Sequence, residues 1–454
     1  MTRRFAIALL VLYAAATLYL AIHHEPWRDE ADSWLLVHHA SLPEIFHWTR
    51  YAGTPALWYV LLKPLAWMQL PYFSQTLLHL LLAWSAAAVL LFCAPFSRLT
   101  KALFLASYYP IYEYSVIARS YVLTNLLLFI AAALYTRRRE RPIAYAIVIA
   151  LMFNANVHAA IIAATLALLF VLDRPRRPAA IAIMAGGAFL AFLQLRIPAD
   201  AAFPHLIRNR DDEALMFTIG QSFLPTVPLY AACAIGIFFL IAVVIVLRHR
   251  RDALFLIFLP LAFFAVLYWR VWFGGFRHAG ILLILVVAAL WIADPIENAR
   301  FLLIALNVML MVSALLAIPI EIQEVAFAFS GSKEMGQYIR DHHLDRYEIA
   351  AHKPYEAEAV LPYLPGKQFW YAGLGEYGTY LQWDRHLRYA GTVSYDEAQI
   401  SARRFFTAQK KPWLLLLNNA MPAPAKRGYV LLYATRQHIF RIDDEKYFLY
   451  RPLP

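Results

Sequence analysis

Long runs of apolar residues, separated by short polar segments, dominate the first 320 residues. The first run covers residues 5–22, about 18 positions, which is just enough for a helix to cross the ~30 Å hydrocarbon core of a membrane. Similar runs recur up to residues 301–319, and the short segments between them carry most of the Arg residues of this half. This pattern predicts a polytopic α-helical membrane module over residues 1–320.

We expect about eleven spans. The apolar stretch 55–70 contains Lys63 and Pro64, and a full crossing there would place Arg98 on the outer side. Either this stretch is re-entrant or the loop at Arg98 breaks the positive-inside rule. The runs expected to cross are 5–22, 74–94, 102–112, 121–136, 143–153, 158–173, 179–195, 229–247, 253–270, 280–293 and 301–319.

Arg3 and Arg4 precede the first run, so we expect it to run outward from the cytoplasm. Residues 23–54 then form the first external loop, whose mixture of aromatic and polar residues suits helices lying along the membrane surface. Residues 112–121 form the outer tip of a later hairpin, and the carboxyl end lies outside.

After Ile320 the apolar runs stop, and residues 325–454 carry short alternating patterns typical of a soluble α/β domain. The Gly373–Gly378 segment lacks the GxGxxG spacing and is interpreted as a turn. The predicted helices are 333–342, 355–363 and 395–409, and the predicted strands are 347–351, 367–371, 413–417, 429–433 and 447–450.

Composition agrees with a membrane protein: 61% of residues are hydrophobic, 16% are charged and the mean hydropathy is +0.53. The net charge of +11 could suggest a nucleic-acid partner, but Lys and Arg cluster between the apolar runs, as the positive-inside rule expects. We therefore expect no nucleic-acid binding. Cys93 and Cys233 both lie inside apolar runs, which argues against a disulfide framework.

The chemistry is concentrated in residues 27–34, where Asp29, Glu30 and Asp32 directly follow the first apolar run. Acidic residues beside a membrane helix are costly unless they stay solvated or serve a function. On the expected topology three other polar groups face the same compartment: Glu113 with Arg119, Asn156 with His158, and Arg277 with His278. A carboxylate beside cations suits a reaction in which a base takes a hydroxyl proton while Arg residues hold an anionic phosphate leaving group.

Several short motifs in this order resemble those of the GT-C glycosyltransferases, which use polyprenyl-phosphate sugars and include protein O-mannosyltransferases and the aminoarabinose transferase of lipid A. Asp29-Glu30 lies in the first external loop, and Gly53-Thr54-Pro55-Ala56-Leu57-Trp58-Tyr59 is similar to the family's His/Lys-Pro-Pro-Leu-x-Tyr segment. Arg119-Ser120-Tyr121 is like the family's Ala-Arg-x-Tyr, and the Asn156/His158 turn follows. The resemblance covers roughly residues 5–320.

The resemblance implies an inverting transfer of a sugar from a polyprenyl-phosphate donor to a hydroxyl of a lipid, glycan or protein acceptor. The reaction would take place at the outer face of a bacterial inner membrane, with the 325–454 domain periplasmic or extracellular. Asp29 would be the base, with Glu30 as its neighbour. No cofactor is assigned, and a divalent cation stays open. The expected substrate contacts are Arg119, Tyr121, Glu113, His158, Asn156, Arg277, His278 and Lys63.

Each assignment has a structural alternative. Asp32 is expected to cap an interfacial helix, and Arg119 could pair with Glu113 instead of a phosphate. His158 could bond a backbone carbonyl, and Lys63 could point away to the interface. At the level of the whole protein, the rivals are a transporter or flippase, which would need polar groups at the midplane, and a non-catalytic membrane scaffold.

Overall fold

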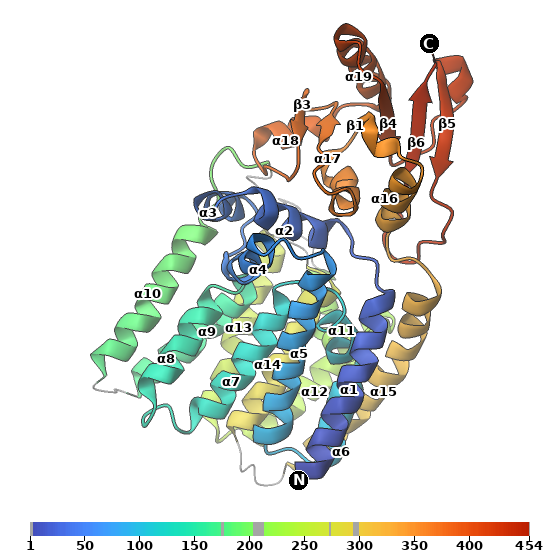
Figure 1. Ribbon diagram of the computed structural model, residues 1–454. Coiled ribbons are helices and arrows are strands. Elements are labelled where there is room, and N and C mark those ends of the chain that lie inside the picture. Colours follow the sequence, from blue (N-terminus) through green and yellow to red (C-terminus); the bar gives the residue numbers. More distant parts are fainter. Residues whose placement is uncertain (1–2, 174–176, 203–212, 272–273, 294–298, 454) are drawn as a thin grey trace.

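The computed structural model describes all residues except 1–2, 174–176, 203–212, 272–273, 294–298 and 454. It consists of a helical bundle and a small domain that contains a β-sheet, which sits on one end of the bundle (Figure 1). The amino terminus lies at the opposite end. The predicted division near residue 320 is close to the end of α15, the last helix of the bundle.

Six helices of the described residues are long and apolar enough to cross a membrane: α1 (Arg3–His23), α5 (Phe73–Cys93), α10 (Pro178–Leu195), α12 (Leu229–Leu247), α13 (Arg251–Arg270) and α15 (Arg300–Ala326). Four further apolar helices have 10–17 residues: α7 (Tyr121–Tyr135), α8 (Pro142–Phe153), α9 (Val157–Leu172) and α14 (Phe276–Ile292). In Figure 1 these helices run side by side across the bundle. The chain is therefore a helical membrane protein.

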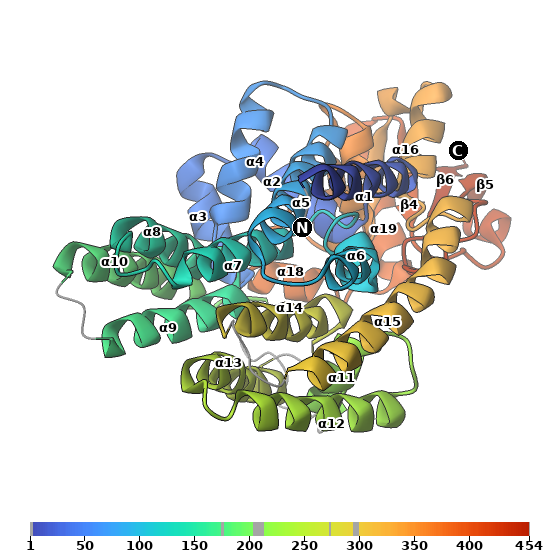
Figure 2. The same ribbon diagram turned by 90° about the horizontal axis from the view of Figure 1, so that it is seen from below.

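The centre of the bundle is α14, in which every residue from His278 to Ile292 is buried. A helix that is apolar on all sides needs neighbours on all sides. Helices α7, α13 and α11 (Glu213–Phe223) pack against it, and Figure 2 shows α14 enclosed between the two halves of the bundle. Gly280 permits a close approach there, because a Cβ atom at this position would lie 2.2 Å from the Tyr109 ring.

Residues 112–121, which were predicted to form an outer hairpin tip, have a different structure. The chain before the tip forms α6 (Arg98–Ala106), and the tip itself begins in a π-helical turn, η1 (Tyr109–Glu113), and continues as an irregular segment. Nearly all of the tip is buried, because Tyr112 and Tyr114 turn inward and bond to Glu324 and to the Arg277 carbonyl. The tip is thus part of the protein interior and not an exposed loop.

Two short helices of the segment predicted as the first external loop, α2 (Arg28–His39) and α3 (Leu42–Tyr51), lie between the bundle and the sheet domain (Figure 1). Leu36 and Val37 of α2 belong to the core of the bundle, whereas Ala31 and Leu35 belong to the core of the sheet domain. The expected surface helix is therefore packed on two faces. The next helix, α4 (Leu57–Trp67), has 11 residues, fewer than the ~20 of an ordinary membrane crossing, and the re-entrant interpretation of this stretch stays a prediction.

The sheet of the second domain has the strand order β3-β2-β1-β4-β6-β5. Strand β1 pairs in parallel with β2 and β4, and the remaining pairs are antiparallel. The strands are β1 (Glu348–Ala351), β2 (Phe369–Tyr371), β3 (Glu376–Gly378), β4 (Trp413–Leu417), β5 (Tyr429–Ala434) and β6 (Phe448–Pro452).

The helical elements of this domain are α16 (Ser332–Asp341), η2 (Leu344–Arg346), α17 (Pro354–Ala357), η3 (Glu358–Tyr363), α18 (Arg385–Ala390), α19 (Tyr395–Gln409) and η4 (Pro424–Arg427). The predicted α/β alternation is confirmed, and α19 and β4 begin and end at the predicted residues. Strand β3 and helix α18 were not predicted, because both are short and lack a clear apolar period. The interpretation of Gly373–Gly378 as a turn is correct only as far as Gly375, because the last three residues form β3.

Candidate active site

The first turn of α2 carries the adjacent acids. Glu30 accepts a hydrogen bond from the Trp27 backbone N–H across 3.3 Å, so it occupies the place of the acid in a capping box. Asp29 lies in the same turn, where the helix dipole favours negative charge. The local sequence thus fixes the start of the helix and presents Asp29 at that start.

Glu30 is fully buried and engaged on both oxygens. One oxygen accepts from the Ala118 N–H at 2.7 Å, and the other lies 2.9 Å from His24 Nε2. These contacts tie α2 to the segment before α7 and to the end of α1. The geometry gives Glu30 a positioning role, since no face of its carboxylate is open to a substrate.

Asp29 is the point where three distant segments meet. Its Oδ2 lies 2.9 Å from Arg119 Nη1 and 3.1 Å from Arg277 Nη1. The same Arg119 nitrogen also donates to the Asp29 backbone carbonyl at 2.8 Å. The side chains of all three residues are about one quarter exposed, so the cluster is accessible from outside the protein.

The cluster carries more positive than negative charge. Burial raises the pKa of Asp29, but attraction to Arg119, Arg277 and Arg28 outweighs it and holds the pKa below the ordinary value. Asp29 is therefore ionised at neutral pH and neutralises only one of the two guanidinium groups that contact it. Arg277 also lies over the Trp27 ring at 5.5 Å, which fixes its direction.

Asp32 is not the helix cap that the sequence predicts. The helix begins at Arg28, so Asp32 lies in its second turn, on the same face as Asp29. Burial raises the pKa of Asp32 to about 7, because the attraction of Arg119 does not offset desolvation and the nearby Asp29 charge. The Trp383 side chain of the sheet domain lies beside this carboxylate and lowers its pKa in part.

A group of polar aromatic side chains adjoins Arg277. Tyr121 Oη lies 2.8 Å from His278 Nε2, and His158 Nε2 lies 2.8 Å from Tyr268 Oη. The two imidazole rings stack with centroids 5.0 Å apart. The expected bond from His158 to a backbone carbonyl is thus replaced by one to a tyrosine hydroxyl on α13.

Three of the predicted substrate contacts make hydrogen bonds within the protein, and their contact with a substrate stays a prediction. Lys63 Nζ donates to the carbonyls of Val37 and Ala40 at 2.6 Å, and so caps the carboxyl end of α2. Asn156 caps α9 by accepting from the Ala159 N–H at 2.9 Å.

Glu113 accepts from Tyr108 Oη at 2.8 Å and lies 4.0 Å from Arg441. The Arg119–Glu113 pair that the sequence left open is therefore absent from the described residues, because Arg119 pairs with Asp29.

The contacts between α2 and the sheet domain were not predicted from the sequence. The Arg28 side chain pairs with Asp444 at 2.6 Å, and the Arg28 backbone N–H donates to Glu445 at 3.1 Å.

Within the bundle, His24 lies between Glu30 and Glu324, with 2.9 Å to each. No local pattern marks these partners, since Glu324 is 300 residues from His24.

In the described parts of the chain, no group of three or more His, Cys, Asp or Glu side chains is placed to hold a metal ion. Comparisons with family models, with curated proteins and with solved structures each find no match. The cluster formed by Asp29, Arg119 and Arg277 is therefore the feature of the molecule from which a function can be inferred.

Proposed function

We propose that the protein is an inverting membrane glycosyltransferase with a GT-C-like arrangement of about eleven spans. It transfers a sugar from a polyprenyl phosphate to a hydroxyl of a lipid, glycan or protein acceptor. In this proposal the reaction takes place at the outer face of a bacterial inner membrane. The observation that carries it is one carboxylate oxygen of Asp29 shared between Arg119 and Arg277.

The two arginines suit a phosphate better than a single carboxylate. Guanidinium groups bind phosphate oxygens through paired N–H donors, and Asp29 neutralises only one of the two charges. A phosphate that enters from the membrane would therefore take hydrogen bonds from both arginines. The lipid chain would stay in the bilayer, while the sugar reached the exposed side of the cluster.

Binding of the phosphate would also activate the base. Once the arginines turn to the phosphate, Asp29 loses the attraction that lowers its pKa and becomes a stronger proton acceptor. The acceptor O–H then gives its proton to Asp29, and its oxygen attacks the anomeric carbon. The bond from that carbon to the phosphate oxygen breaks, and the polyprenyl phosphate leaves with the electron pair, held by both arginines.

Asp32 is the second candidate for the base, because its pKa of about 7 lies near a working pH. It lies one turn from Asp29 and beside Arg119. In this version Asp29 stays ionised and orients the arginines, while Asp32 takes the proton. The two versions differ in which asparagine variant abolishes transfer.

The test compares lipid-linked sugars and surface glycans by mass spectrometry in cells with the wild-type protein, without it, or with the variants Asp29→Asn, Asp32→Asn and Asp443→Asn. We expect loss of the protein to accumulate a lipid-linked sugar and remove one glycan unit. The variant that lacks the base should lower transfer by about 10²–10⁴-fold.

Asp443→Asn is the matched control, because the Asp443 side chain is 83% exposed and its ion pair is with Lys446, which is not part of the cluster. Full transfer by both Asp29→Asn and Asp32→Asn would exclude carboxylate catalysis at α2. An unchanged glycan profile without the protein, together with uptake of a solute by reconstituted vesicles, would favour a transporter.

A further inference from the structure

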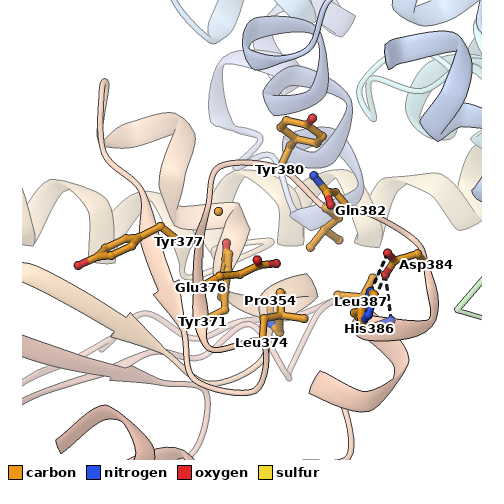
Figure 3. A pocket seen from close by; sticks show the side chains of 12 residues that line it. Pro354, Tyr371, Leu374, Glu376, Tyr377, Tyr380, Gln382, Asp384, His386 and Leu387 are labelled. Atoms are coloured by element: carbon orange, nitrogen blue, oxygen red, sulfur yellow. Dashed lines mark hydrogen bonds and ion pairs between the residues drawn. The ribbon is translucent and has the colours of Figure 1, made fainter. Parts of the chain in front are cut away.

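A hollow in the sheet domain lies outside the cluster described above. It has two adjoining parts that share Leu374, Glu376 and His386, and the larger part has a volume of about 430 Å³. This volume is within the usual range for small-molecule sites. In Figure 3 the Asp384–His386 pair lies on one side, while Tyr377 points away from the other side chains.

The walls of the larger part carry polar groups without partners in the protein. The side chains of Glu376 and Arg385 have no hydrogen-bond or ion-pair partner among the described residues. Tyr389 lines the same hollow and is 68% exposed. A free carboxylate, a free guanidinium and an open aromatic ring are thus grouped around one space.

This combination matches a saccharide. Sugar hydroxyls donate to a carboxylate and accept from a guanidinium, while the C–H face of a sugar ring packs on the negative face of an aromatic ring. A phosphate is less suited, because the charges of Glu376 and Asp384 oppose that of Arg385. An extended peptide is also less suited, since the edge strand β3 has only three residues for strand addition.

The hollow is connected to the candidate active site through a single segment. Trp383 lies between Gln382 and Asp384 in the chain, which both line the smaller part, and its side chain lies beside Asp32. The Trp383 carbonyl accepts from the Ala202 N–H at 2.9 Å, which fixes the segment against the bundle. One segment therefore contacts the carboxylate of α2 and lines the hollow.

We propose that this hollow binds a saccharide unit of the acceptor and holds it next to α2. The acceptor would accordingly be a glycan, which narrows the choice among lipid, glycan and protein. The role of the bound saccharide as acceptor rests on the proposed glycosyltransferase function, whereas saccharide binding itself does not.

The test uses the full chain in lipid nanodiscs and a panel of immobilised, unmodified oligosaccharides. We expect the wild-type protein to bind at least one of them, and Tyr389→Ala and Glu376→Gln to weaken that binding by about tenfold or more. Tyr230→Ala is the matched control, because Tyr230 is also 68% exposed but lies on α12. It should bind like the wild type.

Asp29→Asn separates the two proposals. It should keep oligosaccharide binding, because Asp29 does not line the hollow, and it should lose transfer where Asp29 is the base. Saccharide binding would be excluded if no oligosaccharide were bound, or if Tyr389→Ala and Glu376→Gln bound as tightly as the wild type. If the protein bound an oligosaccharide but performed no transfer, the saccharide site would stand, and the proposal that it holds the acceptor would be overturned.

Discussion

Asp29 and Asp32 lie one helical turn apart on α2, yet their surroundings shift their pKa values in opposite directions. Two arginines contact Asp29 and hold its pKa low, whereas burial dominates at Asp32 and raises its pKa to about 7. Pairs of carboxyl groups separated in this way are typical of sites that need one charged and one protonated group.

The raised pKa of Asp32 predicts a dependence of stability on pH. Between about pH 4 and pH 7 the folded state retains a proton that the unfolded state has lost, so the free energy of unfolding falls as the pH rises. Asp32→Asn should remove this fall. Thermal unfolding of Asp32→Asn and of the wild type should then give equal stability at pH 4. At pH 8 the variant should have a melting temperature at least roughly 2 °C higher than that of the wild type.

Asp443→Asn again serves as the control, because an exposed carboxyl should leave the curve unchanged. Parallel stability curves for the wild type and Asp32→Asn across this range would show that Asp32 titrates near its ordinary value in the folded protein.

At the scale of single helices, small residues set how closely α8 and α10 approach. A Cβ atom at Gly187 of α10 would lie 2.6 Å from the Ala150 backbone of α8, whereas one at the adjacent Gly186 would meet nothing within 4 Å. The neighbouring glycines therefore form a matched pair within one helix, only one of which faces a partner.

Gly187→Ala should separate the two helices and lower the free energy of unfolding by about 1–3 kcal/mol. Gly186→Ala should leave it unchanged or raise it by up to about 1 kcal/mol, because alanine is the better helix former. Denaturation of the purified variants in detergent measures both effects. Equal destabilisation by the two substitutions would contradict the close contact between α8 and α10.

Elements with a strong local pattern were the ones that the sequence could predict. The apolar period and Ser394 cap of α19 mark its ends, and the run Trp413–Leu417 marks β4. The expected topology placed Asp29, Arg119 and Arg277 in one compartment, but the ion pairs between them were not predicted. Lys63 could not be assigned in this way, because its partners are backbone carbonyls of another helix.

At the scale of the whole molecule, His24 connects the beginning of the bundle to its end. Its ring lies between Glu30 on α2 and Glu324 on α15, and all three side chains are fully buried. Burial alone lowers the pKa of His24, but the two carboxylates outweigh it and hold the pKa well above the usual value. The imidazolium is therefore the cation that allows two acids to be buried together.

Removal of this cation should destabilise the protein strongly. His24→Ala leaves two buried carboxylates without their partner, and we expect a loss of about 3–5 kcal/mol in the free energy of unfolding. In the wild type this stabilisation is complete below about pH 6.5 and declines as the pH rises above that value.

Thermal unfolding from pH 6 to pH 10 measures this decline, with His23→Ala as the control because that ring lies on the exposed face and bonds only its own helix. A wild-type curve that stayed flat over this range, or a His24→Ala curve that declined equally, would contradict the role of His24.

The position of α2 between two cores has a consequence for the order in which the protein matures. One face of α2 packs on the core of the sheet domain, and the backbone N–H of its first residue, Arg28, donates to Glu445. We therefore expect α2 to reach its final packing, and Arg28 its partner Glu445, only after nearly all of the chain has been made.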